Sequence, residues 1–423
     1  MRNRSKSMLV VLLSVFACML LVFTVPKKAD AASKFITVEE FAKEIADKLI
    51  IGPVTGKEKS GYVNALLELG IIKDGEFKSY TKEITRGEAA ALINRADEYL
   101  YGDTLDPKLV ELALEKRISD INKAKKSFRE DIVKCYLKGF IKGYSNGAYS
   151  SDREFRVNSR ITRSGALNCL KMLRDKTLRA KLSPDGQLLR TSNLPEKADM
   201  YPYILASYPN EYYDRRFIFE GATIRRGGED PRPMILGEDY APPSHIREVK
   251  EYANFATAMN TYLDTWVDRA VTYLEQVLNV DYRTIDDEWY EEVYKTFGNS
   301  YATVVADEKF EKYKEDVKKT KTIIETEIVA CDGSSLHFWF GQYYLRAYVK
   351  YRIVSCNVPN DYTDGIYLFS KRPYNAVVFS PLDYVDLSGY EVGEWRERFI
   401  RVELSTLKFN DGANLGVISA FIY

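Results

Sequence analysis

The strongest periodic pattern in the chain lies between Ile246 and Val280. Apolar side chains, among them Val249, Trp266 and Leu278, recur there at steps of three and four residues, the spacing that aligns them along one face of an α-helix. The pattern predicts one long amphipathic helix. Its apolar face is interpreted as buried core, with a partner-binding or coiled-coil face as the alternative.

Two shorter helices are predicted next, over residues 286–297 and 306–319. The pattern then changes, because apolar and polar residues alternate over residues 345–353 and again over 400–405. Alternation with a period of two predicts antiparallel strands with one face on the core and the other in water. We therefore expect residues 201–423 to form an α+β domain, in which the long helix comes first and an antiparallel sheet follows.

The first half of the chain carries a repeated pattern instead. The stretch YVNALLELGIIKDGEF is followed by ITRGEAAALINRA, and the stretch IVKCYLKGFIKGYSNGAY is followed by ITRSGALNCLKML. In each copy an amphipathic helix is predicted to end at a glycine, Gly70 or Gly139, because glycine adopts the left-handed conformation that commonly terminates helices. A second helix then opens on Ile-Thr-Arg, and a fainter copy of it begins at Ile36. The repeat predicts an all-α region.

The Ile-Thr-Arg motif supplies candidate helix caps and candidate anion ligands. Thr85 and Thr162 stand at the expected N-cap positions, and Glu88 completes a capping box with Thr85. Arg86 and Arg163 fall in the first helical turn, where backbone N–H groups and the helix dipole favour an anion. A guanidinium there adds paired hydrogen bonds to a carboxylate or phosphate. The alternative is that both arginines pair with glutamates or cap neighbouring helices.

Charge and composition narrow the classes of function. Lys and Arg number 61, equal to the 61 Asp and Glu. This balance argues against a protein held to nucleic acid by a strongly basic surface, which needs an excess of cations. The 31 Tyr, 20 Phe and 4 Trp supply enough apolar surface to argue against disorder. His245 and His337 are the two histidines, which excludes a three-histidine zinc site, and no metal or cofactor is predicted.

The first 31 residues differ from the rest. Five Lys and Arg oppose one acid there, a local net charge of 5 − 1 = +4, and they flank the uncharged run Met8–Val25. A basic start, an apolar run and the small-x-small site Ala29-Asp30-Ala31 are typical of a secretory signal peptide, residues 1–31, cleaved after Ala31. An uncleaved membrane anchor is the alternative. Cleavage predicts an exported chain of net charge 0 − 4 = −4 with no remaining membrane contact.

The repeated stretches resemble S-layer homology (SLH) domains, the modules by which many exported proteins of Gram-positive bacteria attach to cell-wall polysaccharide. The resemblance covers residues 35–175 and lies in the first helix, its Gly-Ile-Ile or Gly-Phe-Ile end, the Asp-Gly or Asn-Gly turn with an aromatic residue soon after, and the Ile-Thr-Arg helix. It implies a partial unit at 35–50 and units at 58–100 and 118–174, gathered around a pseudo-threefold axis. The Trp that the family carries near the start of the first helix is absent, because Trp266 is the first Trp in the chain.

The resemblance also implies a function for residues 32–175: non-catalytic binding of anionic secondary cell-wall polysaccharide. The binding residues that it implies, by position, are Thr85, Arg86, Glu88, Thr162 and Arg163. Residues 176–200 are then interpreted as a linker, and residues 201–423 as a displayed domain of no recognised family. We expect a secreted protein at the cell wall or S-layer surface of a Gram-positive bacterium.

Four cysteines follow the predicted signal peptide: Cys135, Cys169, Cys331 and Cys356. Cys135 and Cys169 occupy apolar helix positions, so packing as small hydrophobes is the first interpretation and a disulfide between them the alternative. Cys331 is interpreted as bonded to Cys356 across the sheet, as unpaired, or as a thiol catalytic partner of His337.

Residues 201–423 contain no motif of a known catalytic class. GxSxG, HExxH, a Gly-rich phosphate loop and an EF-hand loop are all absent. Acidic runs such as Asp286-Asp287-Glu288 are typical of solvated helix faces. A binding or structural role with a protein or glycan partner is therefore favoured for this domain, and a wall-tethered hydrolase acting on polysaccharide is the alternative.

Overall fold

The computed structural model describes seven ranges of the chain, and its overall fold is α+β, with 46% of residues helical and 18% in strands. These ranges are residues 34–54, 60–215, 255–296, 303–339, 342–357, 392–404 and 416–422. The predicted signal peptide, residues 1–31, lies outside them.

The chain divides into two compact units, each discontinuous in sequence. Unit 1 comprises residues 1–103 and 157–178, and unit 2 comprises residues 104–156 and 179–423. This grouping differs from the boundaries expected at residues 175 and 200. Residues 104–156, which were predicted to belong to the repeat region, pack with the C-terminal part of the chain.

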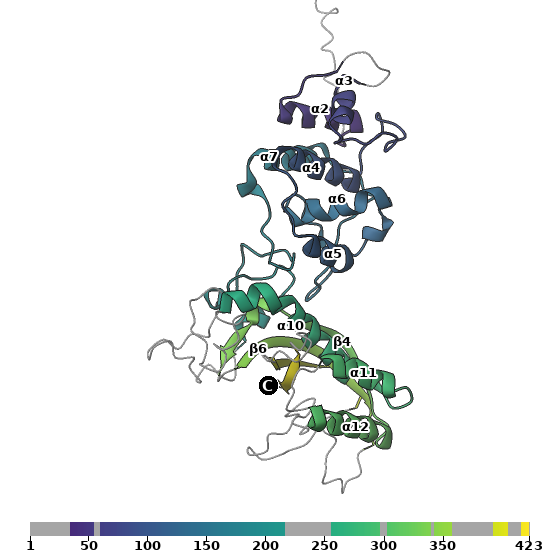
Figure 1. The fold of residues 1–423 in the computed structure, drawn as a ribbon, viewed down its shortest axis with the longest axis vertical. Coiled ribbons are helices and arrows are strands. Elements are labelled where there is room, and N and C mark those ends of the chain that lie inside the picture. Colours follow the sequence, from purple (N-terminus) through teal and green to yellow (C-terminus); the bar gives the residue numbers. More distant parts are fainter. Residues whose placement is uncertain are drawn as a thin grey trace, which may run out of the picture. The chain divides into compact units, whose positions relative to one another are not determined.

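Unit 1 is helical (Figure 1). Its elements are α2 (Val38–Leu49), α3 (Gly61–Glu68), α4 (Arg86–Tyr101), α7 (Arg163–Arg174) and the short 3₁₀ helix η2 (Lys176–Leu178). Helices α2, α4 and α7 contact one another in all three pairs, and α3 packs on α2. Their shared core is apolar, with Phe41, Leu92 and Leu170 fully buried. This packing supplies most of the stability of such short helices, because helices of this length are marginal in isolation.

The starts of α2, α4 and α7 are joined in a closed ring. Antiparallel backbone bridges link Thr37 to Glu83, Thr85 to Arg160 and Thr162 to Phe35. The first amide of each helix also donates to a carbonyl of the next copy, in the pairs Val38–Lys82 (3.0 Å), Arg86–Ser159 (2.7 Å) and Arg163–Lys34 (3.0 Å). Because the third copy pairs back with the first, each helix start is held by the other two. The three similar sequence stretches thus occupy three equivalent places.

Unit 2 begins with a helical subregion. Helix α5 (Pro107–Lys116) has Asp106 as its N-cap and proline at its first position, where a missing N–H costs nothing. The 3₁₀ helix η1 (Ile121–Lys123), helix α6 (Lys126–Leu137) and the two-stranded ribbon of β1 (Tyr144–Ser145) and β2 (Arg153–Glu154) follow. After the interruption by unit 1, the chain returns through the 3₁₀ helix η3 (Ala198–Met200) and the short helix α8 (Asn210–Asp214).

The remainder of unit 2 is a helix-covered antiparallel sheet. Its helices are α10 (Phe255–Leu278), α11 (Asp287–Thr296), α12 (Thr303–Lys319) and the 3₁₀ helix η5 (Gly333–Ser335). Its strands are β3 (Val280–Asp281), β4 (Ile323–Cys331), β5 (His337–Trp339), β6 (Gln342–Ser355), β7 (Arg396–Leu404) and β8 (Val417–Ile422). The strand order is β3-β4-β6-β7-β8, with β5 also paired to β6, and every pairing is antiparallel. The long helix, the two shorter helices and the antiparallel strands agree with the periodic patterns in the sequence.

Helix α10 packs along one face of the sheet (Figure 1). Its predicted apolar face is buried, with Trp266, Leu274 and Val277 at 0% exposure. The matching sheet face carries the predicted alternate residues, including Leu345 and Val349, both fully buried. At about 25 cal/mol per Å² of apolar surface, a stripe of this length is a main source of the free energy that holds helix and sheet together.

The expectation that the opposite sheet face is wet holds for one end of β6 and is wrong for the other. Lys350 and Arg352 keep side-chain exposures of 26% and 36%, whereas Arg346 and Tyr348 are 0% and 5% exposed. A tyrosine-rich segment covers Tyr348: Tyr201, Ile204, Leu205, Tyr208, Tyr212 and Tyr213 form one cluster with Tyr348, Ala330 and Phe399. The ring centroid of Tyr212 also lies 5.1 Å from the guanidinium carbon of Arg346. The alternation in sequence was genuine, but the covering segment lies more than a hundred residues away in the chain, so no local pattern reports it.

Candidate functional site

The predicted helix caps of unit 1 are present. Thr85 Oγ1 accepts a hydrogen bond from the Glu88 amide at 3.2 Å, and the Glu88 carboxylate accepts one from the Thr85 amide at 2.9 Å, which completes the capping box. Thr162 Oγ1 accepts from the Gly165 amide at 3.1 Å, with no reciprocal carboxylate because position 165 is glycine.

A third cap was missed in the sequence, although the signal was there. Thr37 and Glu40 form a second full capping box, with distances of 3.3 Å from the Glu40 amide to Thr37 Oγ1 and 2.8 Å from the Thr37 amide to the Glu40 carboxylate. The stretch Thr-Val-Glu-Glu already carries the Thr-x-x-Glu spacing. All three helix entries are therefore fixed by their own threonine.

Arg163 is held by an acid of the neighbouring copy. Its Nη2 lies 2.6 Å from the Glu40 carboxylate, at partial exposure of both side chains. Burial acts to raise the pKa of Glu40, but hydrogen bonds from the Thr37 amide and from Arg163 outweigh it, and the pKa is lowered overall. The alternative considered from the sequence, that this arginine pairs with a glutamate, is therefore what the structure contains.

The ring geometry gives Arg86 a different neighbour. Arg163 reaches the third helical residue of the next copy, which is Glu40. The equivalent third residue beside Arg86 is Gly165, so no carboxylate occupies that position. The guanidinium of Arg86, at the half-buried start of α4, lies close enough to Cys169 of α7 to act electrostatically on its thiol. The remaining predicted residue, Glu88, pairs with Lys82 at 2.6 Å.

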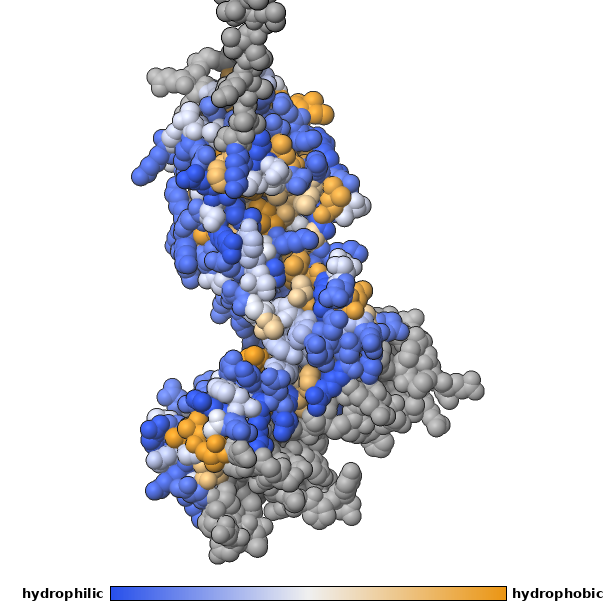
Figure 2. Space-filling model, turned by 180° about the vertical axis from the view of Figure 1, so that it is seen from behind, coloured by the Kyte–Doolittle hydropathy of each residue, from blue (hydrophilic) through white to orange (hydrophobic). Residues whose placement is uncertain are grey.

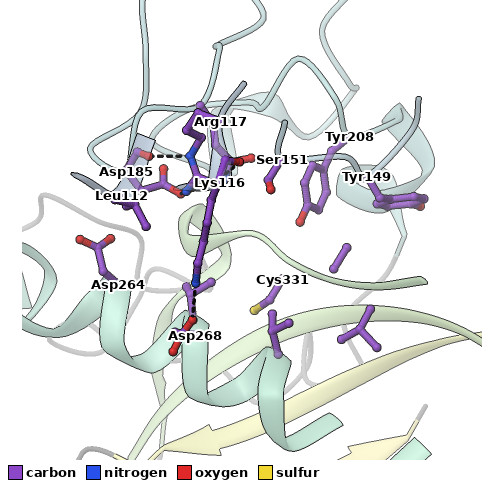
Figure 3. Close-up of a pocket in the computed structure, with 15 residues that line it drawn as sticks. Leu112, Lys116, Arg117, Tyr149, Ser151, Asp185, Tyr208, Asp264, Asp268 and Cys331 are labelled. Atoms are coloured by element: carbon purple, nitrogen blue, oxygen red, sulfur yellow. Dashed lines mark hydrogen bonds and ion pairs between the residues drawn. The ribbon is translucent and has the colours of Figure 1, made fainter. Parts of the chain in front are cut away.

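Unit 2 contains a cleft that no sequence motif indicated (Figure 3). Its volume is about 180 Å³. Five segments contribute walls: the end of α5, the loop after β1, residues 185–208, one face of α10 and the end of β4. The lining residues are Leu112, Lys116, Arg117, Tyr149, Ser151, Asp185, Gln187, Tyr208, Asp264, Val267, Asp268, Val271, Val329, Ala330 and Cys331.

Both cations of the cleft are engaged by acids. Arg117 is buried and binds Asp185 twice, through Nη2 to the carboxylate at 3.0 Å and through Nε to the carbonyl oxygen at 2.8 Å. Lys116 Nζ lies 2.7 Å from the Asp268 carboxylate, in an exposed pair. Figure 3 shows Lys116 extending along one side of the cleft toward α10.

The third acid, Asp264, has no hydrogen bond or ion pair to any residue in the described ranges. It lies on α10 one turn before Asp268, and its side chain reaches solvent. The surrounding protein and then the Asp185 carboxylate raise the pKa of Asp264, against the opposing effect of Arg117. The cleft therefore holds one carboxylate with unused hydrogen-bonding capacity.

Two deeply buried residues of the cleft also keep unused polar atoms. Gln187 is 7% exposed, and its Nε2 donates to Asp185 at 2.7 Å, while its Oε1 has no hydrogen-bond partner among the residues described. Tyr208 is 4% exposed, and its hydroxyl, which points into the open space in Figure 3, bonds to nothing in the described ranges. Buried polar atoms are nearly always satisfied, so Gln187 Oε1 is an exception, and the Tyr208 hydroxyl adds a group that a ligand in the cleft can reach.

The cysteines form none of the disulfides considered from the sequence. All four are free thiols, and Cys135, Cys169 and Cys331 are buried. Cys331 is paired in register with Ala347 of β6, whereas Cys356 follows the far end of that strand. At roughly 3.3 Å per residue, nine residues place the two about 30 Å apart, far beyond bonding distance.

Cys331 also lacks the chemistry of a nucleophile. Its Sγ donates to the Arg346 carbonyl at 3.5 Å, and burial, with the adjacent Asp332, raises the pKa of the thiol well above its usual range. Catalytic cysteines need the opposite shift, because the thiolate is the reactive form. The side chain of His337, the other half of the pair considered, lies outside what the structure describes.

The surface and the remaining searches define what the described residues offer. On the face in Figure 2 the described surface is mostly hydrophilic, with hydrophobic residues in small groups. Within the described ranges, no cluster of three or more His, Cys, Asp or Glu is placed to hold a metal, and no helix combines the length and apolarity needed to cross a bilayer. Comparisons with protein-family models, curated proteins and solved structures gave no match.

Proposed function

We propose that unit 1 is an SLH-like attachment module, by which an exported protein binds anionic secondary polysaccharide of a Gram-positive cell wall while unit 2 is displayed. The observation that carries this proposal is the closed ring of three Ile-Thr helix starts. A ring of three equivalent helix starts supports the proposal, because the resemblance implies units gathered around a pseudo-threefold axis. The ring also brings capped helix starts and arginines together, which suits an anionic ligand.

Within the ring, Arg86 is the better candidate ligand. Arg163 already binds Glu40, so an anion of the polymer must compete with a carboxylate at 2.6 Å. Gly165 of α7 stands at the position that Glu40 holds in α2, and it carries no side chain that would keep a ligand oxygen from the first turn of α7. We expect the junction of α4 and α7 to contribute more binding free energy than that of α7 and α2.

Retention on purified cell-wall sacculi tests the proposal. Arg86→Ala should lower the retained fraction about tenfold, since a charge-assisted bidentate contact contributes on the order of 1.5–3 kcal/mol. Arg163→Ala should lower it less, and Glu40→Gln should raise it by releasing Arg163 from its partner. Lys171→Ala, which removes one positive charge from the far end of α7, is the matched control. If both arginine variants are retained on the sacculi to the same extent as the wild type, the proposed anchoring role is wrong.

A wall-tethered hydrolase is the second candidate, and the unit 2 cleft is where it would act. The cleft gathers three carboxylates: Asp185, Asp264 and Asp268. Asp185 and Asp268 are engaged by Arg117 and Lys116, however, which leaves one unpaired acid rather than the two that glycoside hydrolysis uses. Release of reducing sugars from wall polysaccharide, abolished by Asp264→Asn, would support the hydrolase.

A further inference from the structure

The unit 2 cleft combines hydrogen-bond acceptors with uncharged hydroxyl groups. The charge-bearing donors, Arg117 and Lys116, are engaged by Asp185 and Asp268. The unused groups among the described lining residues are the Asp264 carboxylate, the Gln187 Oε1 atom and the hydroxyls of Tyr149, Ser151 and Tyr208. A carboxylate and an amide oxygen only accept hydrogen bonds, whereas a hydroxyl both accepts and donates. The complementary ligand must therefore bring N–H or O–H donors for Asp264 and Gln187, and hydroxyl groups of its own match the three hydroxyls of the cleft.

The net negative charge of the cleft favours a cationic ligand. Lys116 and Arg117 contribute two positive charges and Asp185, Asp264 and Asp268 three negative ones, so the lining sums to 2 − 3 = −1. The acid left over is Asp264, the one without an ion pair within the described ranges. A bound ammonium group beside it would bring the site to neutrality, and partial burial strengthens such a pair relative to one in open water.

The size and the walls of the cleft select a small, partly apolar ligand. Its volume of about 180 Å³ is below the ~300–1,000 Å³ of pockets for drug-sized molecules. Val267 and Val271, on the same face of α10 as Asp264, and Val329 of β4 supply an apolar part of the lining. On the other side, Tyr149 is fixed by stacking on Tyr348, with ring centroids 4.1 Å apart, and lies edge to face with Tyr208 at 5.2 Å. Rigid rings beside polar groups are suited to a compact ring-shaped ligand.

We propose that this cleft binds an amino sugar carrying a free ammonium group, with the ammonium at Asp264 and the ring hydroxyls at Gln187 and Tyr208. An amino sugar carries its ammonium and hydroxyl groups around one small ring, so it can hydrogen-bond to Asp264, Gln187 and Tyr208 at the same time. A simple alkyl amine, such as a lysine side chain, brings one ammonium on an apolar stem and offers no hydroxyl to the Gln187 Oε1 atom or to the Tyr208 hydroxyl. The proposal does not depend on the attachment function of unit 1.

Isothermal titration calorimetry of the full chain at pH 7.5 and low salt, with four probes, tests the proposal. Glucosamine should bind, and glucose and N-acetylglucosamine should bind at least tenfold more weakly because neither has an ammonium group. Nα-acetyllysine should also bind at least tenfold more weakly than glucosamine. If glucose binds as tightly as glucosamine, the charge of the ligand does not matter and the role of Asp264 is wrong. If Nα-acetyllysine binds as tightly as glucosamine, the site does not require a sugar. Absence of glucosamine binding would overturn the whole proposal.

Two variants and a control locate the ligand. Asp264→Asn should weaken glucosamine binding at least tenfold and abolish the discrimination between glucosamine and glucose, since only the charge is removed. Tyr208→Phe, which keeps the ring and loses the hydroxyl, should weaken binding several-fold. Glu315→Gln, an exposed acid on α12, should change nothing. Thermal unfolding of each variant checks that it is folded. Wild-type affinity in folded Asp264→Asn and Tyr208→Phe variants would place the ligand elsewhere.

Discussion

The helix starts of unit 1 and the sheet of unit 2 differ in how far along the chain their polar groups find partners. In unit 1 the helix caps are closed locally, as in the Thr37–Glu40 and Thr85–Glu88 capping boxes, three residues apart, although the ring that joins the helix starts is made of long-range bridges. In unit 2 the polar groups are partnered across the chain: the Tyr213 hydroxyl donates to Asp332 at 2.6 Å over 119 residues, and the Tyr212 hydroxyl donates to the Arg346 carbonyl at 2.7 Å over 134. Hydrogen bonds between residues close together in the sequence can be predicted from local patterns, whereas those between distant residues cannot.

The largest expected effect comes from the two glycines that end the equivalent helices, one in each unit. Gly70 and Gly139 have φ values of 69° and 76°, and a Cβ at Gly70 would meet nothing within 4 Å, whereas one at Gly139 would lie 2.2 Å from the Ala180 carbonyl oxygen. Gly70→Ala should cost only the left-handed conformation, about 1–2 kcal/mol of unfolding free energy. Gly139→Ala should cost several kcal/mol, because backbone must move.

Urea unfolding followed by hydrogen exchange of each unit measures this difference. The loss should appear in unit 1 for the first variant and in unit 2 for the second. Equal costs would mean that residues around Ala180 yield easily, and the two glycines would then be equivalent, as their sequence contexts suggest.

The buried acid of unit 2 gives the next largest effect. Asp332 is 0% exposed, and burial raises its pKa to about 6, although hydrogen bonds from Ser334 and Tyr213 lower it in part. Because the folded-state pKa is raised, the stabilising protonated form is present at low pH and is lost as pH rises through about 6. Unfolding free energy should therefore increase by about 1–2 kcal/mol from pH 7.5 to pH 5 through this group.

Asp332→Asn should remove that part of the pH dependence. The measurement is urea unfolding of both proteins at several pH values, compared by difference so that other acids cancel. Parallel pH profiles of variant and wild type would show that Asp332 titrates normally, and that unit 2 does not carry a costly buried acid.

The smallest effect separates two caps within unit 1. Thr85 belongs to a reciprocal capping box, whereas Thr162 accepts one hydrogen bond from Gly165. Thr85→Ala should cost about 1–2 kcal/mol and Thr162→Ala about 0.5–1 kcal/mol. Thermal unfolding of the two variants measures the order, with Thr85→Ser, which keeps the hydroxyl, expected near wild type. A larger loss for Thr162→Ala would show that the single cap hydrogen bond of Thr162 stabilises its helix more than the reciprocal capping box of Thr85 does.

Much of the fold was predictable for the same reason that the caps were. The stripe of α10, the alternation on β6 and the glycine helix ends are short-range patterns, and the structure contains each of them. The grouping of residues 104–156 with the C-terminal part was not predictable, because a repeat in sequence says which stretches are alike and not which of them pack together.

The candidate sites show the same division. Thr85, Arg86, Glu88, Thr162 and Arg163 could be named from one motif, but the pairing of Arg163 with Glu40 depended on which copy lies next to it in the ring. The cleft around Asp264 left no trace in the sequence, since its lining comes from five segments.

The sequence by itself determined the helices, their caps and the class of the sheet, because periodicity and capping depend on residues three or four positions apart. Tertiary structure alone decided three further matters: that Phe35 closes the ring on Thr162, that tyrosines from residues 201–213 bury Arg346, and that Asp264 is left without an ion pair among the described residues. Each depends on contacts between segments distant in the chain, and such contacts are set by packing, which no local pattern encodes.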